Sequence, residues 1–118
     1  MNIAACNDCE TCHESGECSI KDDMQKVYEK MLTADGIILG SPVYFWSVSS
    51  QTKAFMDRTY ALRYPNHKLK NKVGGIIVAA GRRGSVNALS TILYKILAFD
   101  TFYKTHGVIH SLDYVFYI

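Results

Sequence analysis

Outside one short stretch near its start, the sequence has no cysteine. The chain has 118 residues and four cysteines, all of which lie between residues 6 and 18. A disulfide scaffold would spread its cysteines through a chain of this size, so this distribution argues against one. Four cysteines in a reducing compartment are more often metal ligands or redox groups than disulfides.

Long apolar runs are also missing. No run approaches the roughly 18 to 20 residues that a membrane-spanning helix needs, and residues 1–6 lack the basic and apolar segments of a signal peptide. We therefore expect a cytoplasmic protein with no membrane partner.

Charge is low and evenly spread. Thirteen basic and eleven acidic side chains leave a net charge of +2, with no block of like charges. This pattern gives no indication of a nucleic-acid partner. The apolar content of 48% suffices for one core. We expect a single domain over residues 1–118, with a cysteine-rich loop over residues 1–21 and an α/β core over residues 22–118.

Helical and strand patterns alternate along this core. Apolar residues at helical spacing predict a helix of about ten residues after Cys18, a second helix over residues 49–62 and a third that begins near Ser85. Continuous apolar runs predict strands over residues 36–40, buried on both faces, over residues 73–80 and over residues 108–118, with a loop over residues 41–50.

This alternation is typical of an α/β domain with a parallel sheet. Ligands of such sheets bind beyond the carboxyl ends of the strands. Two loops of unusual composition follow predicted strands, at residues 41–46 and 81–85. We therefore expect a ligand site where these two loops meet.

The cysteines follow the spacing C-x2-C-x2-C-x5-C, formed by Cys6, Cys9, Cys12 and Cys18. Thiolates are the ligands that iron-sulfur clusters require, and a tight run with two-residue gaps is typical of 4Fe-4S sites. Gly16 allows the chain to turn back, so that the fourth cysteine approaches from another direction.

Three other interpretations of the cysteines stay open at this point. Four cysteines can hold a structural zinc ion, although such sites usually come as two separated C-x2-C pairs. Cys9, Cys12 and His13 also fit the C-x-x-C-H pattern of haem attachment, which would leave the other two cysteines unused; without haem, His13 is a solvated loop residue. The thiols could also form disulfides or bind nothing.

The second signal is aromatic. Tyr44, Phe45 and Trp46 crowd a segment predicted to be a loop at the end of a parallel strand. Such a loop offers flat apolar surfaces and free backbone N–H groups on which an aromatic ring could lie. Alternatively, these side chains cover the edge of the sheet.

The runs DDM, ADGIILGSPVYF and KAFMDRT, followed by a strand and a glycine-containing loop, resemble the NADPH-dependent FMN reductase group of flavodoxin-like proteins. With the cysteine run before them, the chain resembles the iron-sulfur flavoproteins, which carry FMN and a 4Fe-4S cluster. The resemblance covers about residues 4–110. It implies a flavodoxin-like three-layer sandwich with a parallel sheet.

The resemblance also assigns residues. It implies that the four cysteines bind the cluster and that two loops contact the flavin, the first made of Ser41, Pro42, Val43, Tyr44 and Phe45 and the second of Gly81, Arg82, Arg83 and Gly84. Four further residues match the helix after the first loop and are read as mainly structural, with the last two as candidates for subunit contacts: Lys53, Phe55, Asp57 and Arg58.

Two features of the family have no counterpart in this sequence. These are the first strand with its phosphate-binding loop and the helix that closes the fold, so we expect a sheet truncated at both ends. The cysteine run is intact, so the prediction of a metal site is independent of this difference.

The expected function is electron transfer between a 4Fe-4S cluster and FMN by an oxidoreductase, with a ferredoxin-like donor or NAD(P)H as partner. By resemblance, the chain forms a homo-oligomer, a dimer or a tetramer. No catalytic acid, base or nucleophile is assigned. The alternatives are an iron-sulfur carrier or binding module without flavin and a zinc-stabilised structural domain.

Overall fold

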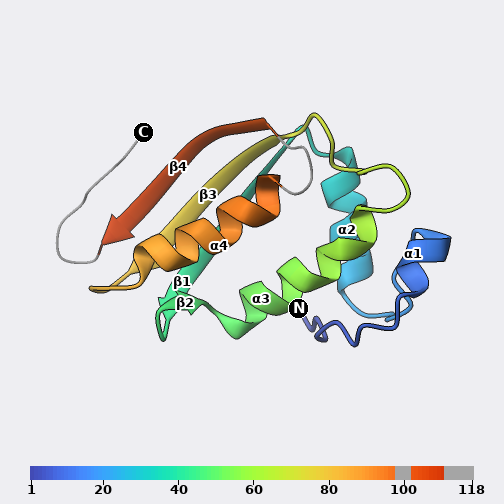
Figure 1. Cartoon of the computed structure of the whole chain (residues 1–118), viewed down its shortest axis with the longest axis horizontal. Coiled ribbons are helices and arrows are strands. Elements are labelled where there is room, and N and C mark those ends of the chain that lie inside the picture. The colour runs from blue at the N-terminus through green and yellow to red at the C-terminus, as the bar shows by residue number, and fades with distance from the viewer. Residues whose placement is uncertain (98–101, 111–118) are drawn as a thin grey trace.

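The computed structural model describes residues 1–97 and 102–110, which form helices around a four-stranded sheet (Figure 1). The elements in chain order are α1 (Thr11–Ser15), α2 (Met24–Thr33), β1 (Gly36–Tyr44), β2 (Ser47–Val48), α3 (Ser50–Arg58), the 3-10 helix η1 (Thr59–Leu62), β3 (Val73–Ala80), α4 (Ser85–Leu97) and β4 (Phe102–His110). Within these residues, no helix has the length and apolar character needed to cross a membrane.

The sheet has the strand order β2-β1-β3-β4. β1, β3 and β4 are parallel, whereas the short β2 returns antiparallel to β1 as a hairpin. Pro42 of β1 lies opposite Ala79 of β3, so the two strands end at the same edge. The predicted α/β class and parallel sheet are confirmed, and the carboxyl ends of β1 and β3 lie side by side.

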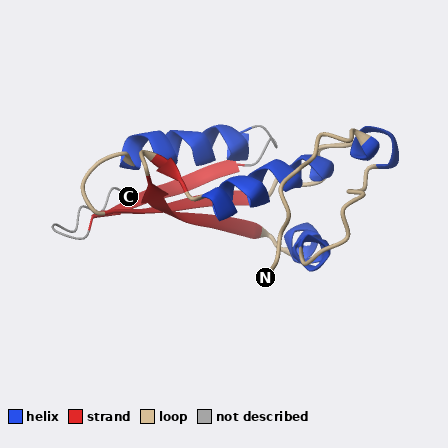
Figure 2. Ribbon diagram, turned by 90° about the horizontal axis from the view of Figure 1, so that it is seen from below, coloured by secondary structure: helices blue, strands red, loops and turns tan. Residues whose placement is uncertain are grey.

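Helices α3 and α4 lie on one face of the sheet (Figure 2). Ile76 and Val78 of β3 point to this face and are buried against Ala88 and Ile92 of α4. On the opposite face, Ile38 of β1 is 72% exposed. The prediction that residues 36–40 are buried on both faces is therefore wrong, because α3 and α4, the helices that cover the sheet among the described residues, lie on the same side.

A second core lies at the end of the sheet where β1 begins. Met24, Tyr28 and Met31 of α2 are buried there against Ala61 and Leu62 of η1. Their spacing along α2 is the helical repeat that the sequence shows, and the helix has the predicted length of ten residues. This core attaches α2 to η1, and the cysteine-rich segment precedes α2.

Three predicted boundaries are wrong. β1 continues to Tyr44 through the predicted loop. On the side away from β3, the described residues pair with β1 only at Val43 and Tyr44, so Pro42 lies where β1 has a free edge. A free edge tolerates proline, because no partner strand needs its missing N–H. The second helix changes to 3-10 geometry after Arg58.

The last strand also begins earlier than predicted. β4 starts at Phe102 and includes Gly107, because its pairing with β3 fixes its length. Residues 111–118, which the prediction assigned to this strand, lie outside the described residues.

Gly84 connects the two loops at the carboxyl edge of the sheet. Its φ is +85°, which L side chains rarely adopt, and a Cβ placed there would lie 2.8 Å from Trp46 Cα and 2.9 Å from Val43 Cγ1. The turn between β1 and β2 therefore packs directly on the backbone before α4.

We expect Gly84→Ala to lower the free energy of unfolding by about 1–3 kcal/mol, because it adds both backbone strain and a backbone clash. Chemical denaturation followed by circular dichroism measures this. Gly40→Ala is the matched control, since a Cβ there meets its nearest neighbour, Ile77 O, at 3.7 Å. Equal stability of the two variants would contradict the packing described here.

Candidate functional site

The four cysteines line one cavity, together with residues from the end of α3 and the start of η1, among them Arg58 and Ala61. All four are free thiols; Cys6 and Cys9 are exposed, and Cys12 and Cys18 are half-buried. The cavity thus brings together the complete predicted ligand set. A group held there would lie at the surface of the molecule.

Gly16 reverses the chain between the third and fourth cysteines. Its φ is +70°, and its N–H donates to Cys12 O at 3.0 Å, which ends α1. Lys68 Nζ donates to Gly16 O at 2.6 Å and fixes the turn against the loop before β3. The expected turn at Gly16 is confirmed, and Cys18, which follows the turn, lines the same cavity as the other three cysteines.

The thiols differ in acidity. Hydrogen bonds to Cys9 lower its pKa from 9.0 to about 7; the largest effect comes from Ser19, whose Oγ lies 3.1 Å from Cys9 Sγ, followed by Thr11. Burial raises the pKa of Cys12, and the neighbouring thiolates raise it further. Gathering four thiolates therefore carries an electrostatic cost that a bound cationic centre would offset.

Within residues 1–97 and 102–110, no three His, Cys, Asp or Glu side chains converge closely enough to hold one metal ion. The four thiols nevertheless surround one cavity. Four thiolates around one cavity are a donor set that an iron-sulfur cluster can take.

Arg58 anchors the chain on both sides of the cysteine loop. Its side chain is 0% exposed, and it makes a two-pronged contact with Asp22, with Nη1 2.7 Å from Oδ2 and Nη2 3.0 Å from Oδ1. Nη1 also donates to Ala4 O at 3.0 Å, and Nη2 donates to Ile20 O at 3.1 Å. The suggestion that Arg58 makes a subunit contact is wrong, because its side chain is fully buried.

His13 has a partner that the sequence interpretation missed. It is exposed, as expected, but it lies in α1 and not in a loop, and its ring packs on Tyr64 at a centroid distance of 4.5 Å and on Tyr60 at 5.4 Å. The two tyrosine hydroxyls lie 3.2 Å apart. The spacing of Tyr60 and Tyr64, four residues apart, is the signal that could have indicated a shared aromatic surface.

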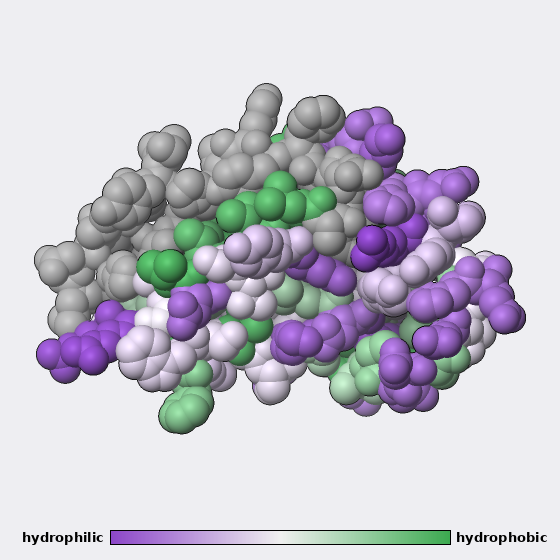
Figure 3. All heavy atoms as spheres, viewed as in Figure 1, coloured by the Kyte–Doolittle hydropathy of each residue, from purple (hydrophilic) through white to green (hydrophobic). Residues whose placement is uncertain are grey.

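The two predicted flavin loops meet at the carboxyl edge of the sheet. A cavity of about 400 Å³ lies between them and is lined by Val43, Phe45, Trp46, Gly81, Arg82 and Arg83. Phe45 is 98% exposed, so it does not cover the edge of the sheet. The turn that carries it projects from the outline of the molecule (Figure 3).

The backbone of this turn is unusual. Phe45 and Trp46 have φ values of +44° and +70°, which residues other than glycine rarely adopt. Ser41, at the base of the turn, is buried; its Oγ donates to Pro42 O at 2.8 Å and accepts the N–H of Ser49 at 3.1 Å. Ser41 thus shapes the first loop from within.

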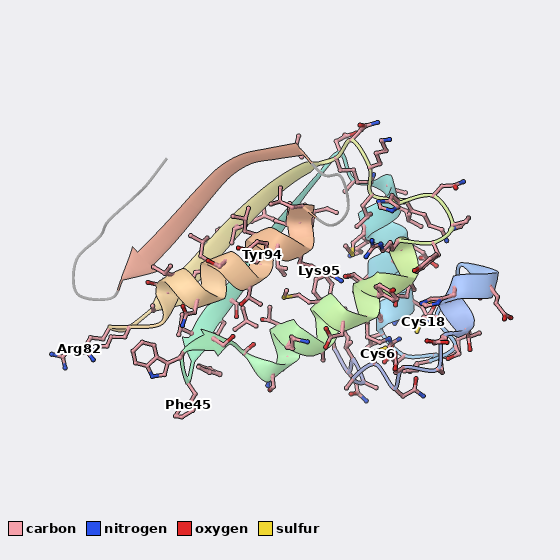
Figure 4. The ribbon with its side chains drawn as sticks, viewed as in Figure 1. Cys6, Cys18, Phe45, Arg82, Tyr94 and Lys95 are labelled. Atoms are coloured by element: carbon pink, nitrogen blue, oxygen red, sulfur yellow. The ribbon has the colours of Figure 1, made fainter. Side chains whose placement is uncertain are left out.

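The two sites lie toward opposite ends of the molecule. Cys6 and Cys18 lie toward one end of the long axis, and Phe45 and Arg82 lie toward the other (Figure 4). The chain measures 46 × 27 × 20 Å along its principal axes. Within one chain, the cysteine cavity and the aromatic turn therefore do not form a common site.

The family model for NADPH-dependent FMN reductases matches residues 2–106. The chain belongs to this family. An iron-sulfur flavoprotein of Methanocaldococcus jannaschii is 52% identical to this FMN reductase family member over 80 residues, which cover 67% of this chain and 41% of the relative. An iron-sulfur flavoprotein of Archaeoglobus fulgidus is 41% identical over 110 residues, which cover 91% of this chain and 53% of the relative.

The family member thus spans about half the length of these relatives. Among solved structures, the flavodoxin, WrbA-like protein of Agrobacterium tumefaciens matches with a TM-score of 0.69 at 20% identity, over 74% of this chain and 59% of that one. This likeness shows the fold, and the expected flavodoxin-like architecture is confirmed.

In the metal-free protein, we expect Cys9 to react with iodoacetamide at pH 7 faster than Cys12, because the pKa of Cys9 is lowered and that of Cys12 is raised. Ser19→Ala removes the hydrogen bond that lowers this pKa the most. A rise of about one pKa unit would reduce the thiolate fraction at pH 7, and hence the rate at Cys9, roughly fivefold. Peptide mass spectrometry after timed labelling measures the rate, with Ser50→Ala as control. An unchanged rate in Ser19→Ala would refute this assignment.

Asp22 should make the free energy of unfolding depend on pH in the acid range. The hydrogen bonds from Arg58 lower its pKa from 3.8 to about 2. Because the folded-state pKa is depressed, the contribution is complete above about pH 4 and is lost as the pH falls toward 2. We expect the stability difference between the parent and Asp22→Asn to shrink by about 1–2 kcal/mol over this range. Urea denaturation at stepped pH tests this; Glu29→Gln should show no comparable change.

Proposed function

We propose that this chain is part of a cytoplasmic electron-transfer oxidoreductase, an iron-sulfur flavoprotein that relays electrons between a 4Fe-4S cluster and FMN. The observation that carries the proposal is the gathering of all four free thiols around one cavity in a chain of the FMN reductase family. The relatives named iron-sulfur flavoproteins support the same assignment.

Cys6, Cys9, Cys12 and Cys18 are the proposed cluster ligands. When bound, the cluster would supply one-electron transfer and the flavin would couple it to two-electron chemistry. The contribution of the chain is to hold the four thiolates apart at a fixed spacing. Gly16 sets the approach of Cys18, and Ser19 keeps Cys9 close to its ionised form at neutral pH.

For FMN, we propose the cavity between the two loops at the carboxyl edge of the sheet. Ser41, Pro42, Val43, Tyr44 and Phe45 would border one side of the flavin ring, and Gly81, Arg82, Arg83 and Gly84 would border the other. Support comes from the exposed aromatic surface of Phe45 and from the space of about 400 Å³ next to it. The arginines add positive charge at the rim, which suits an anionic cofactor.

Because the two sites lie toward opposite ends of the chain, we propose a homo-oligomer, a dimer or a tetramer, in which the cysteine loop of one subunit lies near the flavin of another. The electron donor would be a ferredoxin-like protein or NAD(P)H. The exposure of Cys6 and Cys9 supports an external donor, since an electron can reach the cluster directly from the surface.

Metal, sulfide and flavin analysis of anaerobically purified protein tests the cofactors. We expect about four iron atoms and four sulfides per chain, as one 4Fe-4S cluster requires, with bound FMN. Iron and sulfide without flavin would instead identify an iron-sulfur carrier. Flavin without iron would indicate a simple FMN reductase, and zinc alone would exclude both redox roles.

Cys12→Ser tests the relay. We expect loss of the cluster with retention of any bound flavin, because the thiol lies at the cysteine cavity and not at the aromatic turn. Electron flow from a ferredoxin-type donor to FMN should then stop, as measured by anaerobic stopped-flow absorbance. Glu14→Gln is the control and should transfer electrons at the parent rate, because Glu14 is exposed on the same segment and does not line the cysteine cavity. Undiminished transfer in Cys12→Ser would rule out the relay.

A further inference from the structure

The guanidinium of Arg58 has one donor left over. Arginine carries five N–H donors in a fixed planar fork. In this chain, Nη1 and Nη2 are used by Asp22 and by the carbonyls of Ala4 and Ile20. Nε is buried and has no hydrogen-bond partner among the described residues. A buried polar group without a partner is costly, so its retention calls for an explanation.

This donor belongs to a side chain that lines the cysteine cavity. Cys18 lies beside it: burial lowers the pKa of Arg58, but the hydrogen bonds to Asp22 and then the neighbouring Cys18 raise it, and the net shift is upward. Burial raises the pKa of Tyr28, and the same thiol raises it further. Arg58 is therefore a buried cation beside one of the four proposed ligands.

The ion pair of Arg58 and Asp22 is not explained by stability alone. A buried ion pair is often no more stabilising than well-packed apolar residues of the same volume, because both charges lose water. The pair also fixes the relative positions of chain segments. It binds Ala4 on one side of the cysteine loop and Ile20 and Asp22 on the other, so the two ends of the loop are held at one point.

We propose that Arg58 is a positioning residue for the iron-sulfur cluster, which clamps both ends of the cysteine loop and directs its remaining N–H and its positive charge toward the sulfur ligands. This inference rests on the proposed function, because it requires the cluster. Hydrogen bonds to sulfur and nearby positive charge stabilise the more negative, reduced form. Arg58 therefore raises the reduction potential of the cluster, and Asp22 partly offsets this effect.

Substitutions of Asp22 and of Arg58 should shift the reduction potential of the cluster in opposite directions. Asp22→Asn keeps the shape of Asp22 but removes its negative charge, so the full charge of Arg58 acts on the cluster and the reduction potential should rise. Arg58→Met removes the positive charge and leaves the carboxylate of Asp22, so the potential should fall. A residue with only a structural role would reduce cluster content without shifting the potential of the clusters that form.

The experiment is an anaerobic redox titration of the purified holoprotein, followed by electron paramagnetic resonance, for the parent, Asp22→Asn and Arg58→Met. Iron content is measured in parallel. Arg63→Met is the control, because Arg63 is an exposed arginine close in sequence, and solvent screens its charge. We expect its potential to match that of the parent.

If Arg58→Met does not fold, as judged by circular dichroism, Arg58→Lys replaces it; lysine keeps the charge but lacks the Nε–H donor, so a lower potential is expected. A parent protein without iron and sulfide would refute the proposed function itself. A parent with an intact cluster whose potential is unchanged in Asp22→Asn, or changes in the same direction in both members of the pair, would overturn the inference while leaving the proposed function in place.

Discussion

The guanidinium of Arg58 holds together segments that have no regular secondary structure of their own. The cysteine-rich segment contains only one short helix, α1, and has few apolar side chains to bury. Its attachment to the domain therefore depends on polar contacts, and the strongest of these converge on one buried cation at the end of α3. Tyr28 of α2 adds to the same point, since its hydroxyl donates to Arg58 O at 2.6 Å. One side chain thus couples the cysteine loop to α2 and α3.

Much of the architecture could be predicted because it depends on apolar patterning. The continuous run of residues 73–80 indicates a strand of a parallel sheet, and the structure has that strand with the same bounds. The apolar residues of α2 recur at helical spacing and face the second core. Glycines at the ends of strands marked the loops that meet at the carboxyl edge. In each case, local sequence and tertiary packing require the same conformation.

The remainder could not be predicted because it depends on contacts between distant parts of the chain. Arg58 looks like a surface residue in sequence, and only its pairing with Asp22, 36 residues away, explains its burial. The length of β4 follows from its pairing with β3 and not from its own apolar run. Ile38 lies in an apolar strand and is exposed because of where the helices pack, which a single strand does not encode. His13 likewise acquires its aromatic neighbours only through the fold.

The acidity of Cys9 has a consequence for how the proposed metal site would be assembled. An exposed thiol with a pKa of about 7 is substantially ionised at neutral pH, and the thiolate is the form that binds metals and reacts with oxidants. The same hydrogen bond from Ser19 that readies this sulfur for a metal thus leaves it vulnerable to sulfenic acid formation in air. In the proposed cluster site, oxidation of Cys9 before iron is bound would remove one of the four thiolate ligands.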